Sequence, residues 1–327
     1  MDWRATRRRM LAATAAAAVL RPGMGNSQAA WPNRPLRLVV PFAPGGTTDV
    51  MARLLADTLG PRLGQPVVVE NRAGAGATIG AALVARAAAD GYTLLMSNSS
   101  SHGVSPTLYP NLPFDPIGDF THLGLVATSP SVLVVTANHP ARTLPDFLAQ
   151  ARRDGEIRFA VAGIGTSSHL AGVRLGTALG VTVTAVPYRG AGPAMTDTIA
   201  GVLPAMLDSL PSAAPHFRAG SVRALGVTSA VRVPRYPDLP TMREAGLDLV
   251  SMAWFGLSAP KDLPPEIGAR IVGAMRETLR DPAVVQRFED LLGTPPPDST
   301  PEGYRAFIAE EIATFAPLVR SAGLQPT

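Results

Sequence analysis

Two turns of the sequence combine glycine with several neighbouring hydroxyl side chains. The first contains Gly46, Thr47, Thr48 and Asp49, and the second contains Gly165, Thr166, Ser167, Ser168 and His169. Each turn follows a short apolar segment and precedes a segment with helical spacing, which predicts a strand that leads into a helix N-terminus. A helix N-terminus presents N–H groups without intrahelical partners and a partial positive charge. Because glycine lets the backbone approach a ligand, the turns predict a site for a small carboxylate that requires neither Lys nor Arg.

The same side chains are also suited to capping the helices that follow. Thr48 or Asp49 would cap the first helix, and Ser167 or Ser168 the second. Capping accounts for one side chain in each turn, whereas each turn has several, so we expect ligand binding together with some capping. Asp49 would repel an anion, which favours capping for this residue. His169 fits donation to a carboxylate and a packing or capping role equally well.

Two further polar residues end predicted strands. Asp208 follows the apolar run 205–207 and would orient a ligand or a water molecule, or cap a helix predicted at 211–218. Asn98 ends the apolar segment 92–98. Ligands of open α/β sheets bind outside the carboxyl ends of the strands, so we include both residues in the candidate site.

Apolar segments of strand length alternate with helical patterns after residue 30. Strands are predicted at 36–42, 66–71, 92–98, 158–162, 181–186, 202–207 and 222–228. Helices are predicted at 50–63, 78–89, 144–153, 168–179, 193–200, 211–218, 265–280, 282–292 and 301–320. Short, Val-rich strands that alternate with helices are typical of an α/β fold with parallel sheets.

The two turns belong to two halves of the sequence that resemble each other. In each half an apolar segment leads into a turn, a helix ending in Leu-Gly, a Val-rich segment and a turn of small residues. Long apolar segments at 123–137 and 249–259 lie where the halves meet, and we expect the chain to cross between two lobes there. The prediction is a two-lobed α/β fold with two similar, parallel-rich sheets flanked by helices. One lobe would contain 30–128 and 253–327, and the other 129–252.

The N-terminal segment 1–29 has the pattern of an export signal. Three arginines at 7–9 precede an apolar run at 10–20 that is too short to span a membrane, and small residues follow up to Ala29. The pattern at 6–11 also resembles a twin-arginine signal, and an Arg-rich Sec signal is the alternative. We therefore expect a soluble periplasmic protein after cleavage near Ala29.

The positive charge of the chain comes from this N-terminal segment. The formal net charge is +4 and the sequence pI is about 9.9, but from residue 30 onward acidic and basic residues balance. A nucleic-acid partner is therefore not expected. The sequence has no Cys, no phosphate-loop or zinc-protease motif and no nucleophile elbow, so we expect no metal, no cofactor and no catalytic activity.

Segments at 40–49, 69–76, 90–94, 113–116, 163–170, 186–190 and 223–228 follow one another in the order of a known family. Together they resemble the Bug (TctC-like) family, the extracytoplasmic substrate-binding proteins of tripartite tricarboxylate transporters. The resemblance implies a type II-like periplasmic-binding-protein fold that closes around a carboxylate held between the turns at 45–49 and 165–169. The ligand contacts that it implies are Gly46, Thr47, Thr48, Asp49, Asn98, Gly165, Thr166, Ser167, Ser168, His169 and Asp208.

These observations predict a periplasmic receptor that binds a small carboxylate between its lobes and delivers it to the permease of a tripartite tricarboxylate-type transporter. We expect a monomer, with the membrane permease subunits on separate chains. One alternative is a secreted α/β hydrolase, against which the missing nucleophile elbow argues. The other is a ligand sensor that presents its closed form to a membrane signalling protein.

Overall fold

The computed structural model describes residues 31–324, so the predicted export signal and its cleavage site near Ala29 lie outside the described residues. The strands are β1 (Leu36–Val40), β2 (Val67–Asn71), β3 (Thr93–Asn98), β4 (Phe120–Thr136), β5 (Glu156–Val161), β6 (Thr182–Pro187), β7 (Ala205–Ser209), β8 (Val222–Val227) and β9 (Met252–Pro260). The α-helices are α2 (Thr47–Leu63), α3 (Thr78–Ala85), α4 (Ser105–Leu108), α5 (Leu144–Asp154), α6 (Ser167–Leu179), α7 (Ala191–Ile199), α8 (Leu210–Arg218), α9 (Pro265–Arg280), α10 (Pro282–Asp290) and α11 (Pro301–Ser321). Two further short helical segments are η2 (Ala75–Ala77) and η3 (Ser99–Val104). Within residues 31–324 no helix has both the length and the apolar character needed to span a membrane.

The strand order has the same pattern in its two halves. The strands pair in the order β2-β1-β3-β9-β4-β7-β5-β6, with β8 also paired to β4. β1 lies in parallel between β2 and β3, and β5 lies in parallel between β6 and β7. β9 and β4 then extend these groups in the antiparallel direction. This repeated arrangement confirms the two-lobed α/β fold. We call the part built on β1, β2, β3 and β9 lobe 1, and the part built on β5 to β8 lobe 2.

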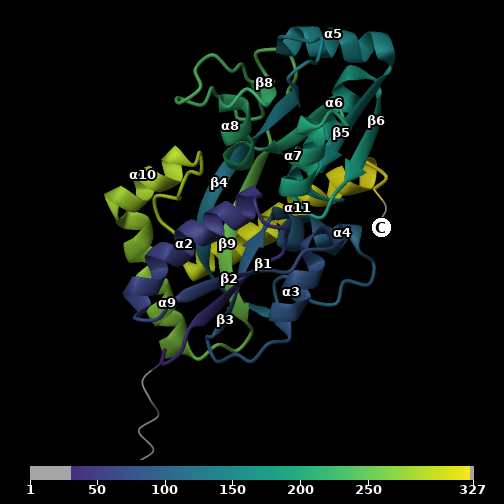
Figure 1. Ribbon diagram of the computed structural model, residues 1–327. Coiled ribbons are helices and arrows are strands. Elements are labelled where there is room, and N and C mark those ends of the chain that lie inside the picture. Colours follow the sequence, from purple (N-terminus) through teal and green to yellow (C-terminus); the bar gives the residue numbers. More distant parts are fainter. Residues whose placement is uncertain (1–30, 325–327) are drawn as a thin grey trace, which may run out of the picture.

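β4 runs through both lobes (Figure 1), whereas β9 pairs with the first part of β4 and with β3 in lobe 1. Residues Phe120 to Pro130 of β4 pair with β9, whereas residues Ser131 to Thr136 pair with β7 and β8. These strands correspond to the long apolar segments that the sequence predicts as crossovers.

Helices cover both faces of the sheet in each lobe. In lobe 1, α2, α9 and α10 form one apolar layer, to which Leu55, Met275 and Phe288 contribute, and α3 contributes to the other layer. In lobe 2, α5 and α6 pack on one face, and α7 and α8 on the opposite face. α11 lies against β4, η3 and α4, and its Phe315 packs with Leu170 of α6. The inner strands β1, β3, β7 and β9 are buried along most of their length, which explains their near-continuous apolar sequences, whereas the edge strands β2 and β6 are partly exposed.

Two local differences from the predicted elements affect the site. α2 begins at Thr47, three residues before the predicted start at residue 50, so the hydroxyl residues of the first turn are already helical. η3 and α4 form a helical segment over 99–108 that the sequence pattern does not reveal, because its Ser and Gly residues are poor helix formers.

Candidate functional site

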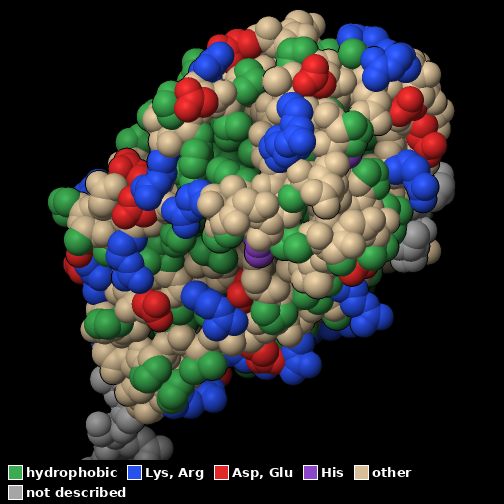
Figure 2. Space-filling view, turned by 45° about the horizontal axis from the view of Figure 1, so that its top comes forward, with side chains coloured by type: hydrophobic (Ala, Val, Ile, Leu, Met, Phe, Trp, Pro, Cys, Tyr) green, Lys and Arg blue, Asp and Glu red, His purple; other side chains and the backbone are tan. Residues whose placement is uncertain are grey.

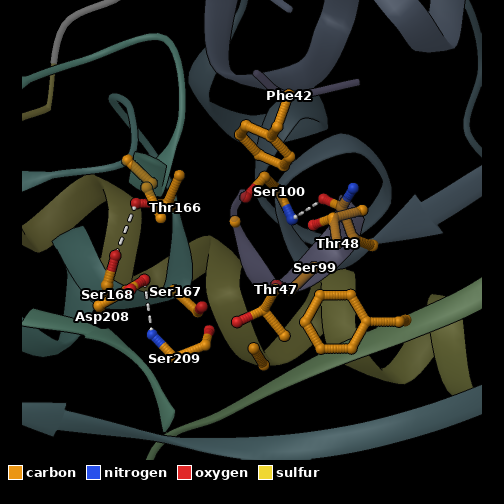
Figure 3. A pocket seen from close by; sticks show the side chains of 16 residues that line it. Phe42, Thr47, Thr48, Ser99, Ser100, Thr166, Ser167, Ser168, Asp208 and Ser209 are labelled. Atoms are coloured by element: carbon orange, nitrogen blue, oxygen red, sulfur yellow. Dashed lines mark hydrogen bonds between the residues drawn. The ribbon is translucent and has the colours of Figure 1, made fainter. Parts of the chain in front are cut away.

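A small cavity lies between the lobes, where β1, β3, β5 and β7 end. Its volume is about 40 Å³. Figure 3 shows Thr166, Ser167 and Ser168 on one side, and Thr48, Ser99 and Ser100 on the other. The complete lining is Phe42, Gly46, Thr47, Thr48, Asn98, Ser99, Ser100, Ala162, Thr166, Ser167, Ser168, Ala191, Asp208, Ser209, Ala253 and Phe255.

The structure brings most of the predicted site residues to this cavity. Those that line it are Gly46, Thr47, Thr48, Asn98, Thr166, Ser167, Ser168 and Asp208. Asp49, Gly165 and His169 are buried and are adjacent in sequence to lining residues, but they do not line the cavity. Asn98 and Asp208 lie at the carboxyl ends of β3 and β7, and the other predicted site residues follow β1 and β5 in the chain.

Thr47 and Thr48 occupy the first turn of α2. The N-cap residue of this helix is Gly46, and no side chain caps it, so the predicted capping role is wrong for both Thr48 and Asp49. Thr48 is 6 % exposed, and its hydroxyl has no hydrogen-bond partner among residues 31–324. Because the side chain lines the cavity, its hydroxyl is available to a ligand.

Asp49 holds the turn that precedes α2. Its carboxylate accepts hydrogen bonds from the Gly45 N–H at 3.1 Å, from Arg53 at 3.0 Å and from the Asn71 amide at 2.9 Å. Burial alone would raise the pKa of Asp49, but these hydrogen bonds outweigh it and lower the pKa. The charge of Asp49 is therefore balanced by Arg53, which fits the structural role rather than ligand contact.

Asn98 shapes the part of the lining that comes from the end of β3 and the start of η3. Its side-chain oxygen accepts hydrogen bonds from the N–H groups of Ser100, at 2.9 Å, and Ser101, at 3.1 Å, and so begins η3. This turn places Ser99 and Ser100 in the lining. The sequence does not predict either serine as a site residue, although their position directly after a strand end is a signal that identifies them.

Thr166 caps α6 on the opposite side of the cavity. Its hydroxyl donates to the Gly163 carbonyl at 2.9 Å and accepts from the His169 N–H at 3.3 Å. Ser168 Oγ lies 3.1 Å from Thr166 Oγ1. The cap is therefore Thr166, not Ser167 or Ser168 as predicted, and both serines remain in the lining.

Gly165 and His169 support this turn from outside the cavity. Gly165 has φ +72°, and a Cβ at this position would lie 2.5 Å from Leu108, so glycine is required for the backbone conformation and for packing. Its N–H donates to His169 Nδ1 at 3.2 Å. Burial lowers the pKa of His169 to about 4. His169 is thus a neutral imidazole, which agrees with the packing alternative.

Asp208 is linked to lobe 1 through Ser212, a residue that the sequence does not predict as part of the site. Asp208 Oδ1 accepts from the Ser209 N–H at 2.8 Å, and Oδ2 accepts from Ser212 Oγ at 2.5 Å. Ser212 Oγ lies 2.9 Å from Thr47 Oγ1, and the Ser212 N–H donates to Thr47 at 3.3 Å. Ser212 follows Asp208 by one helical turn, but only the tertiary structure shows that it contacts the other lobe.

The electrostatics of the cavity favour an anion. The N-termini of α2, α6, α7 and α8 supply Gly46, Ser167, Ala191 and Ser209 to the lining. Each N-terminus adds a partial positive charge and N–H groups. Asp208 is the only ionisable side chain in the lining, and burial raises its pKa to about 6 against the opposing hydrogen bonds from Ser212 and Ser209.

A wider chamber adjoins the cavity and opens towards solvent. Its volume is about 800 Å³, and Phe42 and Ala162 line both spaces. Segments of both lobes form its walls, and the Ala43 N–H donates across them to the Arg189 carbonyl at 3.0 Å. Arg189 has the only charged side chain in the lining of this chamber. Elsewhere, Figure 2 shows Lys and Arg side chains interspersed with Asp and Glu over the visible face, without a patch of one sign.

Comparisons with known proteins agree on one family. The model of the family described as "Tripartite tricarboxylate transporter family receptor" matches residues 51–324. Protein BugT of Bordetella pertussis is 41% identical over 296 residues, which cover 90% of each chain.

Similar solved structures include that of the periplasmic binding protein BugD, with 36% identity, a TM-score of 0.86, and coverage of 90% of this chain and 99% of BugD. Rpa4515 of R. palustris with adipate has 33% identity, a TM-score of 0.87 and coverage of 91% and 100%. MatC of Rhodopseudomonas palustris with bound malate has 35% identity, a TM-score of 0.83 and coverage of 88% and 100%.

Proposed function

We propose that this chain, which belongs to the tripartite tricarboxylate transporter receptor family, binds a small carboxylate in the interlobe cavity and delivers it to a tripartite tricarboxylate-type permease. The family consists of periplasmic substrate-binding receptors and not enzymes, so the alternative of a secreted hydrolase is wrong. The related structures with adipate and malate support a carboxylate ligand.

The observation that carries the proposal is the convergence of helix N-termini and hydroxyl groups at one cavity. Gly46, Thr47 and Thr48 face the opposite turn formed by Thr166, Ser167 and Ser168. N–H groups and hydroxyls donate hydrogen bonds to a carboxylate without adding a full positive charge. In this proposal Asn98 shapes the lining, and Asp49, Gly165 and His169 support the turns from behind.

The proposal includes a closing motion of two lobes. One lobe comprises residues 31–128 and 253–324, and the other comprises 129–252. The pairing of β4 with β9 before residue 131 and with β7 and β8 after it supports this division. A carboxylate that contacts both turns would favour the closed arrangement by its differential affinity for it.

The remaining parts of the proposal concern export and partners. The segment 1–29 would direct export, by the twin-arginine or the Sec route, with cleavage near Ala29. The mature protein would act as a periplasmic monomer, and the permease subunits would be separate chains. The family description supports the transporter partner.

Ligand-dependent thermal unfolding of the mature chain tests carboxylate binding. Adipate and malate are compared with adipamide, which has the length of adipate but no charge. We expect adipate or malate to raise the melting temperature in a concentration-dependent manner, because a ligand that binds only the folded state stabilises it. Adipamide is expected to have no effect. An equal shift with adipamide, or none with any carboxylate of a wider panel, would reject the anion site.

A further inference from the structure

Asp208 is an acid in a cavity that otherwise favours anions. It is 3 % exposed and lies beside the N-terminus of α8. An ionised Asp208 would repel the carboxylate that we propose as ligand. Burial already raises the pKa of Asp208 to about 6, so its protonation costs little near neutral pH.

The hydrogen bonds of Ser212 depend on whether Asp208 is ionised. The ionised Asp208 accepts from Ser212 Oγ at 2.5 Å, which leaves Ser212 Oγ to accept from Thr47 Oγ1 at 2.9 Å. The hydroxyl hydrogen of Thr47 is then directed at Ser212 and is not available to a ligand in the cavity.

A protonated Asp208 reverses this order. Its O–H donates to Ser212 Oγ, and the hydroxyl of Ser212 then donates to Thr47 Oγ1, which lies 2.9 Å away. Thr47 Oγ1 still accepts from the Ser212 N–H at 3.3 Å. The Thr47 hydroxyl is then free to donate to a carboxylate in the cavity, so one proton both removes a repulsion and adds a donor.

We propose that the cavity binds its carboxylate together with one proton, which Asp208 holds, and that Ser212 is a positioning residue that orients the Thr47 hydroxyl accordingly. This inference rests on the proposed carboxylate site. It assigns a role to Ser212, which does not line the cavity itself. It also assigns the ligand class: a carboxylate that is taken up with a proton from solution.

Other ionisable groups near Asp208 are placed less well to hold the proton that is taken up with the carboxylate. Asp49 on α2 is paired with Arg53, and His169 on α6 accepts the Gly165 N–H. Asp57 and Arg62 lie on later turns of α2, which packs on α8. The remaining ionisable residues of the elements packed on β7 lie away from its carboxyl end: Arg174, Asp197, His216, Arg218, His122, Glu156 and Arg158. Burial and the hydrogen bonds from Ser212 and Ser209 account for the shift in the pKa of Asp208.

Calorimetric titration of the mature protein with adipate and malate tests the proposal. Measurements run from about pH 6.5 to about pH 8.5, where the carboxyl groups of both probes are ionised, in two buffers of different ionisation enthalpy. We expect the Kd to rise by up to about tenfold per pH unit, with uptake of up to about one proton per ligand bound. A pH-independent Kd without proton uptake overturns the proposal.

Two substitutions test whether Asp208 holds the proton that is taken up with the ligand. Asn at position 208 is neutral and donates to Ser212, so Asp208→Asn is expected to bind with a pH-independent Kd and without proton uptake. Ser212→Ala removes a hydrogen bond that stabilises the ionised acid, so the midpoint of the pH profile is expected to move to higher pH, and Ser212→Thr to restore it. An unchanged pH profile in Asp208→Asn also overturns the proposal. If the proposed carboxylate site itself is wrong, neither adipate nor malate binds at any pH, and this result differs from binding with a pH-independent Kd.

Discussion

Replacement of Thr48 by Val tests whether the cavity hydroxyls bind a ligand. Val has the shape of Thr but has a methyl group in place of the hydroxyl. The hydroxyl of Thr48 makes no hydrogen bond with other residues in 31–324. The folded protein therefore loses no internal hydrogen bond through this substitution. A carboxylate in the cavity loses one donor.

The expected magnitude follows from the charge of the proposed ligand. A hydrogen bond to a charged group contributes about 1.5–3 kcal/mol. Since about 1.4 kcal/mol corresponds to a factor of ten in Kd, Thr48→Val is expected to weaken binding of adipate or malate by about 10- to 140-fold. The melting temperature without ligand is expected to remain close to that of the unchanged protein.

Thr58→Val is the matched control, because it makes the same chemical change in the same helix. Thr58 is 7 % exposed, but its hydroxyl donates to the carbonyls of Leu54, at 2.8 Å, and Leu55, at 3.1 Å, and it does not line the cavity. We expect the Kd of Thr58→Val to equal that of the unchanged protein. Calorimetric titration gives the Kd values, and scanning calorimetry gives the melting temperatures.

One combination of results would refute the reasoning. If Thr48→Val binds the acid as tightly as Thr58→Val does and also has a lower melting temperature, the hydroxyl of Thr48 stabilises the fold. The cavity wall at α2 would then not contact the carboxylate.

Three further predictions address closure, pH and ligand length. A Cβ at Gly192 would clash with the Pro44 carbonyl across the lobes, so Gly192→Ala is expected to weaken adipate binding by about tenfold or more, with little change in melting temperature. Burial lowers the pKa of His122 and His169 to about 4, from an ordinary 6.5. The unfolded chain then binds protons first, so the free energy of unfolding, measured with urea, is expected to decrease as the pH falls from 6.5 towards 4, and less so in His169→Gln. Arg189→Gln is expected to weaken adipate binding by about two- to fivefold in calorimetric titrations and to leave acetate binding unchanged, as for an exposed ion pair.

Most of the fold could be predicted because its signals are local. Val-rich segments such as β2 and the Pro-initiated helices α9 and α11 are recognisable from a few consecutive residues. The internal repeat then indicates how the elements are grouped. The helical segment 99–108 was missed because its Ser-rich sequence is compatible with a loop, and its start depends on the hydrogen bonds of Asn98.

The site was predicted less completely because neighbouring residues of one turn have different roles. Thr48 lines the cavity, whereas Asp49, the next residue of the same helix, pairs with Arg53. Successive side chains on a helix point in different directions, and the sequence does not show which direction faces the cavity. Ser212 depends on a contact with Thr47 that is 165 residues away in the sequence, so no local pattern reveals it.

Because the cavity is small, we expect ligand entry to require separation of the lobes. A volume of about 40 Å³ holds roughly three water molecules, which is less than a six-carbon diacid needs. Separation breaks the bonds between Thr47 and Ser212 and between Ala43 and Arg189, which join the lobes beside the ligand spaces. Each such bond contributes about 0.5–1.5 kcal/mol to the arrangement in which the lobes are together, so opening costs that amount until the lobes close again around the ligand. An acid that contacts only one lobe gains nothing from closure, so we expect tight binding only of a carboxylate that contacts both turns.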